Sequence, residues 1–225
     1  MSTAAAGTRN KNFITAAALK RIAAVTMLID HIGAFLIGTR NIFPGTQSGA
    51  LFCFYTACRV IGRISFPIFA FLLAEGFYHT RNPKKYLLRV WIFALISEIP
   101  YNLCMSGTWT DPLHQNILFS FGLSLFLLQG LDILEKRKDG IYRFISVKIL
   151  YEILLTAAAA FFSEALHFDY GWETPVLVSF FFLFRYRIPF FTCLEKGKGN
   201  KMFYYWLYPG HLFLLWLIGH FFLRG

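Results

Sequence analysis

Asp30 and His31 are two ionisable residues inside an otherwise apolar stretch, MLIDHIG at residues 27–33. In a helix that begins near Arg21, a rise of about 1.5 Å per residue places them roughly 14 Å along the axis, close to the middle of a hydrocarbon core about 30 Å thick. Ionisable groups at that depth are costly and normally face the protein interior or a water-filled cavity. A carboxylate beside an imidazole can hold and move a proton, so this pair is the first candidate site for acid–base or nucleophilic chemistry.

Other polar residues are predicted at a similar depth in separate apolar segments. They are Glu98, His211 and, at or slightly outside this level, Arg63. A proline stands within about one turn of each, at positions 67, 100 and 209, and cannot donate to the backbone carbonyl four residues before it. Because irregular backbone at membrane depth is tolerated where it lines a cavity, we predict that these helices bend around an interior pocket.

The second apolar segment carries Arg59 and Arg63 one turn apart, and Glu75 lies about 18 Å further along the same helix. Arg63 is therefore too far from Glu75 to pair with it, and we expect it to pair with Asp30 or Glu98. A mouth of the pocket is predicted from Glu75, His79, Tyr86 and Arg89. Basic residues at such a mouth can bind phosphate groups.

Seven apolar segments are long enough to position these residues across a membrane. They occupy residues 19–38, 50–78, 86–105, 116–134, 144–166, 170–187 and 203–223. The second is long enough to be tilted or broken, and the sixth is short. We predict an all-α polytopic membrane protein of about seven transmembrane helices in one bundle, with residues 1–18 as a cytoplasmic tail and residues 19–225 as a single domain.

Composition supports a membrane protein and argues against a soluble one. The 225 residues are 56% hydrophobic and 19% aromatic, with 15% charged residues and a mean hydropathy of +0.51. The net charge of +10 does not indicate nucleic-acid binding, because the basic residues are confined to short connections between apolar segments. The cysteines Cys53, Cys58, Cys104 and Cys193 show neither CxxC spacing nor a histidine at zinc-ligand spacing, so no metal is predicted.

The charges alternate between successive connections. One set is basic: Arg9, Lys11, Lys20 and Arg21, then Arg81, Lys84, Lys85 and Arg89, then Lys136, Arg137, Lys138, Arg143 and Lys148, then Arg185, Arg187, Lys196, Lys198 and Lys201. The other set holds only Arg40 and Arg224 as cations, beside Asp111, Glu164, Asp169 and Glu173. The positive-inside rule then places the N-terminus of a multi-pass membrane protein in the cytoplasm and its C-terminus outside.

Several ordered blocks of this sequence resemble one protein family. They are IDHIG at 29–33, GRISFPIFAFLLAEGFYHTRNPKKYLLR at 62–89, ISEIPYNL at 96–103, FDYG at 168–171 and YPGHL at 208–212. This pattern resembles the TraX family of bacterial inner-membrane proteins, densely over about residues 19–105 and in short islands after that. One member of that family is associated with acetylation of the N-terminus of a conjugative pilin, and the family is similar, more distantly, to membrane acyltransferases that use a cytoplasmic acyl-CoA.

The resemblance implies acyl transfer from a cytoplasmic acyl-CoA, expected to be acetyl-CoA, without a metal. His31 would be the general base or acyl carrier, supported by Asp30 or Glu98, and Arg63 would stabilise the oxyanion. The donor would contact Arg59, Glu75, His79, Tyr86, Arg89 and His211. The acceptor would be an amine or hydroxyl of an envelope glycan, wall polymer, lipid or protein N-terminus.

Two other functions fit the same polar residues. Asp, Glu and His at mid-membrane depth on proline-broken helices also describe a proton-coupled transporter. A noncatalytic scaffold is the third alternative, in which the polar cluster only orders the bundle. Intramembrane proteolysis is disfavoured because the sequence contains neither HExxH nor GxSxG.

Overall fold

The chain folds into a bundle of helices. The structure, a computed structural model, describes residues 15–39, 49–137, 145–185 and 201–221. Its elements are α1 (Ala16–Ile32), the π-helix η1 (Gly33–Thr39), α2 (Ala50–Gly62), α3 (Ser65–Tyr78), α4 (Pro83–Met105), α5 (Ile117–Lys136), α6 (Ile145–Ala165), α7 (Glu173–Leu183) and α9 (Lys201–Phe221). Each of these helices overlaps one of the predicted apolar segments. No strand occurs in the described ranges, so the all-α prediction is confirmed.

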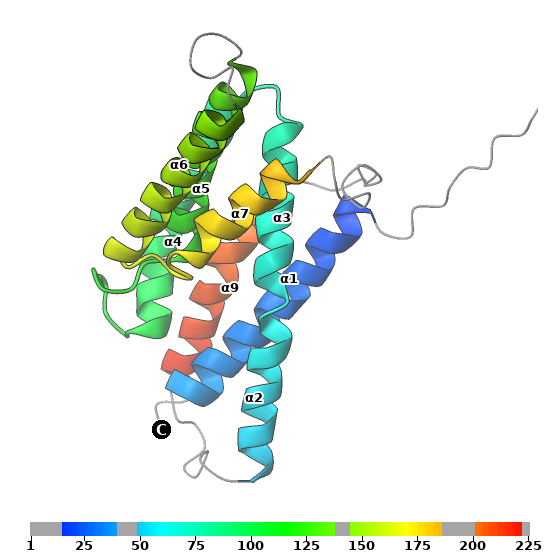
Figure 1. Cartoon of the computed structure of the whole chain (residues 1–225). Helices are drawn as coiled ribbons and strands as arrows, with labels where there is room; N and C mark the ends of the chain where they lie inside the picture. Colours follow the sequence, from blue (N-terminus) through cyan, green and yellow to red (C-terminus); the bar gives the residue numbers. More distant parts are fainter. Residues whose placement is uncertain (1–14, 40–48, 138–144, 186–200, 222–225) are drawn as a thin grey trace, which may run out of the picture.

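The helices reverse direction from one to the next, with α2 and α3 forming a single pass (Figure 1). The basic end of the bundle holds the first two turns of α1, the α3–α4 connection with the first turn of α4, and the end of α5. These segments carry Lys20, Arg21, Arg81, Lys84, Lys85, Lys136 and Arg137. The opposite end holds the start of α2, the α4–α5 connection and the end of α9. Of the predicted charge pattern, Arg9, Lys11, Arg40, Lys138, Arg143, Arg187, Lys196, Lys198, Arg224 and the side chain of Lys201 lie outside the described residues, as does Cys193.

Within the described residues, four helical segments are long and apolar enough to cross a membrane: Ala50–Tyr78, Pro83–Met105, Ile117–Lys136 and Ile145–Ala165. The chain is therefore a membrane protein. Helix α7 is a shorter apolar helix, beginning at Glu173 rather than at the predicted residue 170. Helix α1 begins at Ala16, earlier than the predicted residue 19, so the predicted tail overlaps the first turn. A total of seven membrane spans remains a prediction.

The second apolar segment is broken, as its length and proline suggested. Helix α2 ends at Gly62 and α3 begins at Ser65, with Arg63 and Ile64 between them. Pro67 has no N–H to donate to the carbonyl of Arg63, so the helical hydrogen-bond pattern fails at this turn. The Ser65 hydroxyl donates to the carbonyl of Gly62, the last residue of α2, at 2.7 Å. In contrast, α4 and α9 continue through Pro100 and Pro209.

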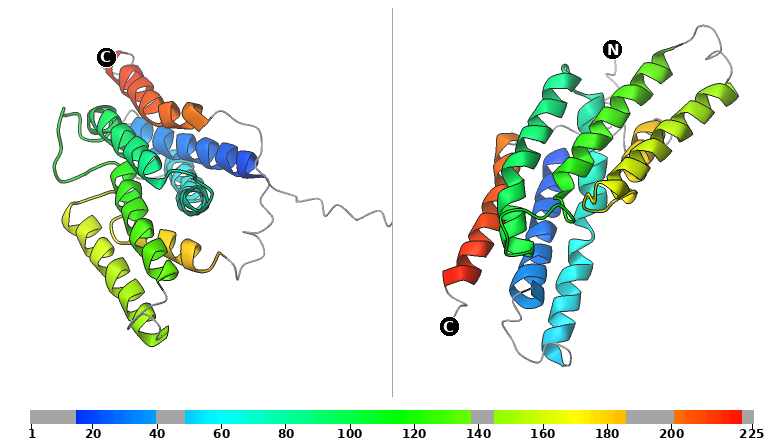
Figure 2. Two further views of the ribbon diagram at one scale, coloured as in Figure 1. Left: turned by 90° about the horizontal axis from the view of Figure 1, so that it is seen from above. Right: turned by 90° about the vertical axis from the view of Figure 1, so that its left-hand side faces the viewer.

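The two largest apolar clusters join most of the bundle. The larger lies mainly between α3, α5 and α7, with one residue each from α4 and α6, and the smaller joins α1, η1, α4 and α9. Helix α4 packs between α5 and α9, and α1 packs against α2 and α3 (Figure 2). Phe69, Ile117 and Leu118 pack against both clusters and so connect them.

Helices α1 and α2 approach closely at two glycines. A β-carbon on Gly33 would lie 2.6 Å from Cys58 Cβ, and one on Gly62 would overlap the Asp30 side chain. Small residues allow helix backbones to approach in this way in membrane proteins. The contact fixes the rotation of α1 relative to α2, and it therefore decides which polar side chains of the two helices meet.

We predict that Gly62→Ala lowers the stability of the folded protein by about 1–3 kcal/mol, because the added methyl group must displace Asp30 or separate the helices. Thermal unfolding in detergent measures the change. Gly130→Ala is the matched control, since its β-carbon would meet only Leu155 Cδ1 at an ordinary 3.5 Å. Equal melting temperatures for the wild type and Gly62→Ala would contradict the close contact.

Candidate functional site

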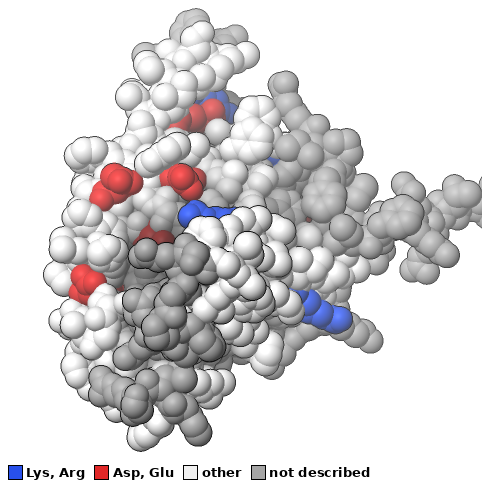
Figure 3. Space-filling model, turned by 90° about the horizontal axis from the view of Figure 1, so that it is seen from below, with Lys and Arg blue, Asp and Glu red and all other residues white. Residues whose placement is uncertain are grey.

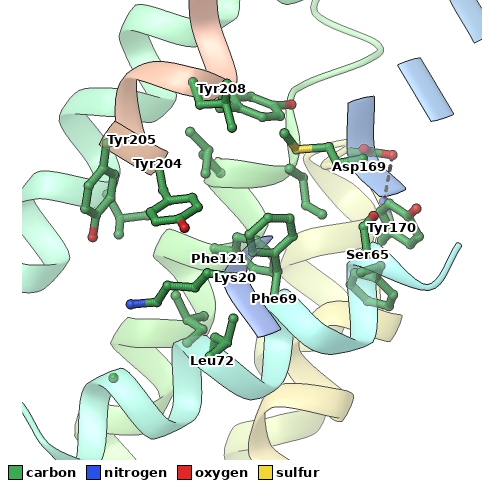
Figure 4. A pocket seen from close by; sticks show the side chains of 18 of the residues that line it. Lys20, Ser65, Phe69, Leu72, Phe121, Asp169, Tyr170, Tyr204, Tyr205 and Tyr208 are labelled. Carbon is green, nitrogen blue, oxygen red and sulfur yellow. Dashed lines mark hydrogen bonds between the residues drawn. The ribbon is translucent and has the colours of Figure 1, made fainter. Parts of the chain in front are cut away.

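A cavity of about 1010 Å³ extends from the basic end into the bundle. Lys20, Arg81 and Lys85 line it at the basic end, and Asp30 and His31 line its interior. Apolar side chains such as those of Phe69, Leu72 and Phe121 form the walls between these two regions, and tyrosines of α9 face them (Figure 4). The volume is at the upper limit of the range of about 300–1,000 Å³ that is usual for small-molecule sites.

Most of the predicted site residues line this cavity. They are Asp30, His31, Arg59, Arg63, Glu75, His79, Tyr86 and Arg89. Glu98 and His211 are not among the lining residues, although His211 contacts His31, which is. The predicted interior pocket therefore exists, and both members of the Asp30–His31 pair reach it, although neighbouring residues are about 100° apart on a helix.

Asp30 pairs with Arg59 and not with Arg63. Arg59 Nη1 donates to Asp30 Oδ2 at 2.8 Å, and the other oxygen, Oδ1, is buried without a hydrogen-bond partner. The expected ion pair of Arg63 with Asp30 or Glu98 is wrong. The reason is the close contact of Gly62 with Asp30, which brings the preceding turn of α2, with Arg59, alongside the carboxylate.

Arg63 instead stands at the break between α2 and α3. Its guanidinium carbon lies 5.7 Å from the centroid of the Tyr170 ring, within the distance of a cation–π contact. The other partner of that ring is Phe66, which stacks on it with centroids 4.0 Å apart. Arg63 is exposed and lines the cavity, so its charge is available there.

His31 pairs with His211. His31 Nδ1 and His211 Nε2 are 2.6 Å apart, and His211 Nδ1 lies 2.7 Å from the carbonyl oxygen of Leu207. His211 is 7% exposed, whereas His31 is half-buried and faces the cavity. Neither Asp30 nor Glu98 is the partner of His31, so that part of the expected arrangement is wrong, and His211 is not positioned to contact a donor in the cavity.

Glu98 connects two helices. Its Oε2 accepts from Asn116 Nδ2 at 2.6 Å and from the Asn116 backbone N–H at 3.3 Å, while Oε1 accepts from Asn102 Nδ2 at 3.3 Å. Asn116 also caps α5, since its Oδ1 accepts from the backbone N–H of Leu118. Glu98 thus fixes the start of α5 to α4, and its predicted catalytic role remains a prediction.

The mouth at the basic end contains the predicted Glu75, His79, Tyr86 and Arg89. His79 Nε2 lies 2.8 Å from Glu75 Oε1, and the Arg89 guanidinium lies 5.8 Å from the centre of the Tyr205 ring. Because Glu75 is engaged with His79, the remaining positive groups of Arg81, Lys85 and Arg89 give this mouth an excess of positive charge.

The segment between α6 and α7 is a part of the site that sequence reasoning missed. Asp169, Tyr170 and Gly171 line the cavity, and the segment is fixed to α5 because Ser120 Oγ donates to the Asp169 carbonyl at 2.6 Å. Tyr170 has a φ of 60° and Gly171 a φ of 41°, which turns the chain sharply. The charge pattern predicts Asp169 in a connection opposite the basic ones and indicates no role for it in the site. Figure 3 shows the molecule from the end opposite the basic one, where acidic side chains are visible along one side.

Lys20 was also missed as a site residue, although its spacing carried a signal. Lys20 and His31 are eleven residues apart on α1, which corresponds to three turns and brings both side chains to one face, about 16 Å apart. Both line the cavity, and Lys20 points into it beside Tyr204 (Figure 4).

Asp169 lies outside the helices, and burial raises the pKa of its carboxyl from the ordinary 3.8 to about 6. The folded state then binds this proton more tightly than the unfolded state, so stability falls as pH rises from about 4 to about 6. We predict that Asp169→Asn raises the melting temperature above pH 6 and leaves it unchanged below pH 4. Melting curves of both proteins from pH 3 to pH 8 test this, and a constant difference at all pH values would contradict it.

A sequence profile of the TraX protein family matches residues 15–194, which is most of the chain. The chain belongs to the TraX family. The match includes the break between α2 and α3, the cavity-lining turn at 168–171 and every predicted site residue except His211.

A curated relative of this TraX chain is a probable fimbrial assembly protein, FimC of serogroup H1, from Dichelobacter nodosus. The two are 31% identical over 127 residues, which cover 53% of this chain and 47% of the relative. The match thus spans about half the length of that relative. No solved structure matches this chain.

Proposed function

We propose that this TraX protein is a membrane acyltransferase that takes an acyl group, in the first instance acetyl, from acyl-CoA bound at the basic end. The basic end would face the cytoplasm, as the positive-inside rule requires of a plasma-membrane protein. The acceptor would be an amine or hydroxyl of an envelope component. The observation that supports this proposal is a single cavity with cations at its mouth and a histidine in its interior.

The cavity fits the shape of an acyl-CoA. The nucleotide carries phosphates, which Lys20, Lys85 and Arg89 would hold at the mouth. The distance of about 16 Å from Lys20 to His31 along α1 requires a long, thin linker between phosphate and thioester, and the pantetheine arm is such a linker. The apolar walls between these points suit its methylene groups and exclude water.

His31 would act as the general base. Its imidazole removes the proton from the acceptor as the acceptor oxygen or nitrogen bonds to the thioester carbon. The tetrahedral intermediate then collapses, the C–S bond breaks, and the thiolate takes the proton from His31 and leaves as CoA. Arg63 lines the same cavity and would stabilise the negative oxygen of the intermediate, an interaction that is stronger where water is excluded.

The comparison with known proteins suggests one class of acceptor. The relative from Dichelobacter nodosus is described as a probable fimbrial assembly protein. We therefore include fimbrial or pilin-like envelope proteins among the candidate acceptors, beside glycans, wall polymers and lipids. The segment 164–173, which lines the cavity away from the basic mouth, is where an acceptor would enter.

The proposed function is tested by release of free CoA. Purified protein in nanodiscs is given acetyl-CoA with and without a bacterial envelope extract, and thiol release is followed with time. We expect release that increases when the extract is added. Protein that binds acetyl-CoA but never turns it over, with any extract fraction, would contradict acyl transfer.

We predict that Lys20→Met weakens binding of acetyl-CoA about tenfold, because a contact to phosphate is lost at the mouth. Equilibrium binding of labelled acetyl-CoA at constant salt measures this. Lys84→Met is the matched control, since Lys84 is an exposed lysine of the same end that does not line the cavity. Equal losses for the two variants would mean that general surface charge, and not the mouth, binds the donor.

A proton-coupled transporter is the second candidate, because the lining includes both the basic mouth and the acidic residues Glu164, Asp169 and Glu173. Uptake into vesicles that depends on a proton gradient and does not consume acetyl-CoA would favour it.

A further inference from the structure

The two histidines make an in-plane hydrogen bond and not a face-to-face stack. The ring planes of His31 and His211 differ by 14°, and their centroids are 4.9 Å apart while Nδ1 and Nε2 are 2.6 Å apart. Because the ring centroids are 4.9 Å apart while the two nitrogens are only 2.6 Å apart, both nitrogens lie between the two ring centres. Stacked rings would not give this arrangement. Tyr208 packs edge-on against both rings and holds them in this plane.

The contacts select one tautomer for each neutral ring. The Leu207 carbonyl can only accept, so His211 must carry its proton on Nδ1 to donate to it at 2.7 Å. Neutral His211 then has a lone pair on Nε2. His31 must in turn carry its proton on Nδ1 to donate to that lone pair. The opposite arrangement would place a bare nitrogen of His211 against a carbonyl oxygen.

We propose that His211 is a positioning residue, which through its bond to the Leu207 carbonyl makes Nε2 of His31 the basic atom that faces the cavity. This inference rests on the proposed acyl transfer for its catalytic meaning. When His31 takes the acceptor proton on Nε2, it becomes a cation and its Nδ1–H bond to His211 becomes charge-assisted and stronger. His211 holds the ring as a second neutral imidazole, in the place where many hydrolases use a carboxylate.

Sequence spacing alone does not predict the contact between His31 and His211. His31 and His211 are separated by 180 residues and lie on α1 and α9. His211 is buried and outside the cavity lining, so it does not touch a donor or acceptor itself. Its effect must therefore appear in the rate of the chemical step and not in donor binding.

Nitrogen-15 NMR of histidine-labelled protein in nanodiscs at pH 8 tests the tautomer directly. Signals are assigned by comparison with His31→Gln and His211→Gln. We expect His31 to be protonated on Nδ1 and unprotonated on Nε2. Protonation of His31 on Nε2 in the wild type would overturn the inference, whether or not the protein turns over acetyl-CoA.

Kinetics provide the second test. We expect His211→Leu to lower kcat for CoA release about 100-fold with KM for acetyl-CoA within about twofold, because the orienting acceptor is lost. His211→Gln, whose amide oxygen can accept from His31, should recover at least about tenfold of that loss. His220→Leu, on the same helix and outside the cavity lining, should keep the wild-type rate. Equal rates for the Leu and Gln variants would overturn the positioning role.

The two failures are distinguishable. If the wild type binds acetyl-CoA without turnover, the proposed function fails, and the NMR result alone decides the histidine arrangement. If turnover occurs but His211→Leu matches the wild type, the function stands and the inference fails. If His211→Leu does not fold, the Gln variant and the wild-type NMR spectrum still give the answer.

Discussion

Replacing His31 by glutamine should lower the rate of CoA release by about 10²–10⁴-fold while acetyl-CoA binding stays within about twofold. The proposed base is lost, but glutamine has a similar size and can still bond to His211, so the cavity keeps its shape. Thiol release and equilibrium binding are measured on the same preparation in nanodiscs. His220→Gln is the matched control, because it changes a histidine of the same bundle that does not line the cavity.

A His31→Gln variant with full activity would remove His31 from the chemistry. Loss of both binding and thermal stability would instead indicate that His31 serves the fold. Only a low rate with intact binding and an unchanged melting temperature supports its role as general base.

Breaking the Asp30–Arg59 ion pair should have the largest effect on stability. We expect Arg59→Met to destabilise the protein by about 2–3 kcal/mol, since it leaves the Asp30 carboxylate buried without its partner. This is below the 3–5 kcal/mol that is typical of fully buried pairs, because the Arg59 side chain is 33% exposed and partly screened by solvent.

The double variant Asp30→Asn with Arg59→Met should recover most of that loss, because no unpaired carboxylate remains. Chemical unfolding in mild detergent measures all three proteins. Arg63→Met is the control, since Arg63 is exposed and makes no ion pair within the described part of the chain. Additive losses for Asp30→Asn and Arg59→Met would contradict the pairing.

Much of the fold was predictable because a membrane imposes strong rules on a sequence. Apolar length and alternating basic connections located the helices, and the proline at position 67 indicated the break at Arg63. Helix ends were less accurate. Helix α7 proved shorter than its apolar segment, because the turn at Tyr170 and Gly171 occupies residues that hydropathy alone assigns to the helix.

The composition of the site was predictable, but its pairing was not. Depth along each helix correctly placed Asp30, His31 and Arg63 around one cavity, whereas Glu98 and His211, predicted at the same depth, do not line it. Arg59 and Arg63 share one face of a regular helix, so spacing cannot tell which of them reaches Asp30. The close approach of α1 to α2 at Gly62 decides it.

The partner of His31 could not be predicted from the sequence for a related reason. His211 stands on α9, and its meeting with α1 depends on how α4 and α9 pack, which a single sequence does not encode in any local pattern. The turn at Asp169 was missed because an acidic residue in a connection is expected to be solvated. Here the hydrogen bond from the Ser120 hydroxyl to the Asp169 carbonyl holds the turn against α5.

The most direct test of the central claim is transfer of a labelled acetyl group. Protein in nanodiscs is incubated with [¹⁴C]acetyl-CoA and envelope extract, and the label is sought in covalent form in the extract after CoA is removed. We expect label in an envelope component with the wild type and at least about 100-fold less with His31→Gln. Label that stays on CoA in both samples, while the donor binds, would contradict acyl transfer.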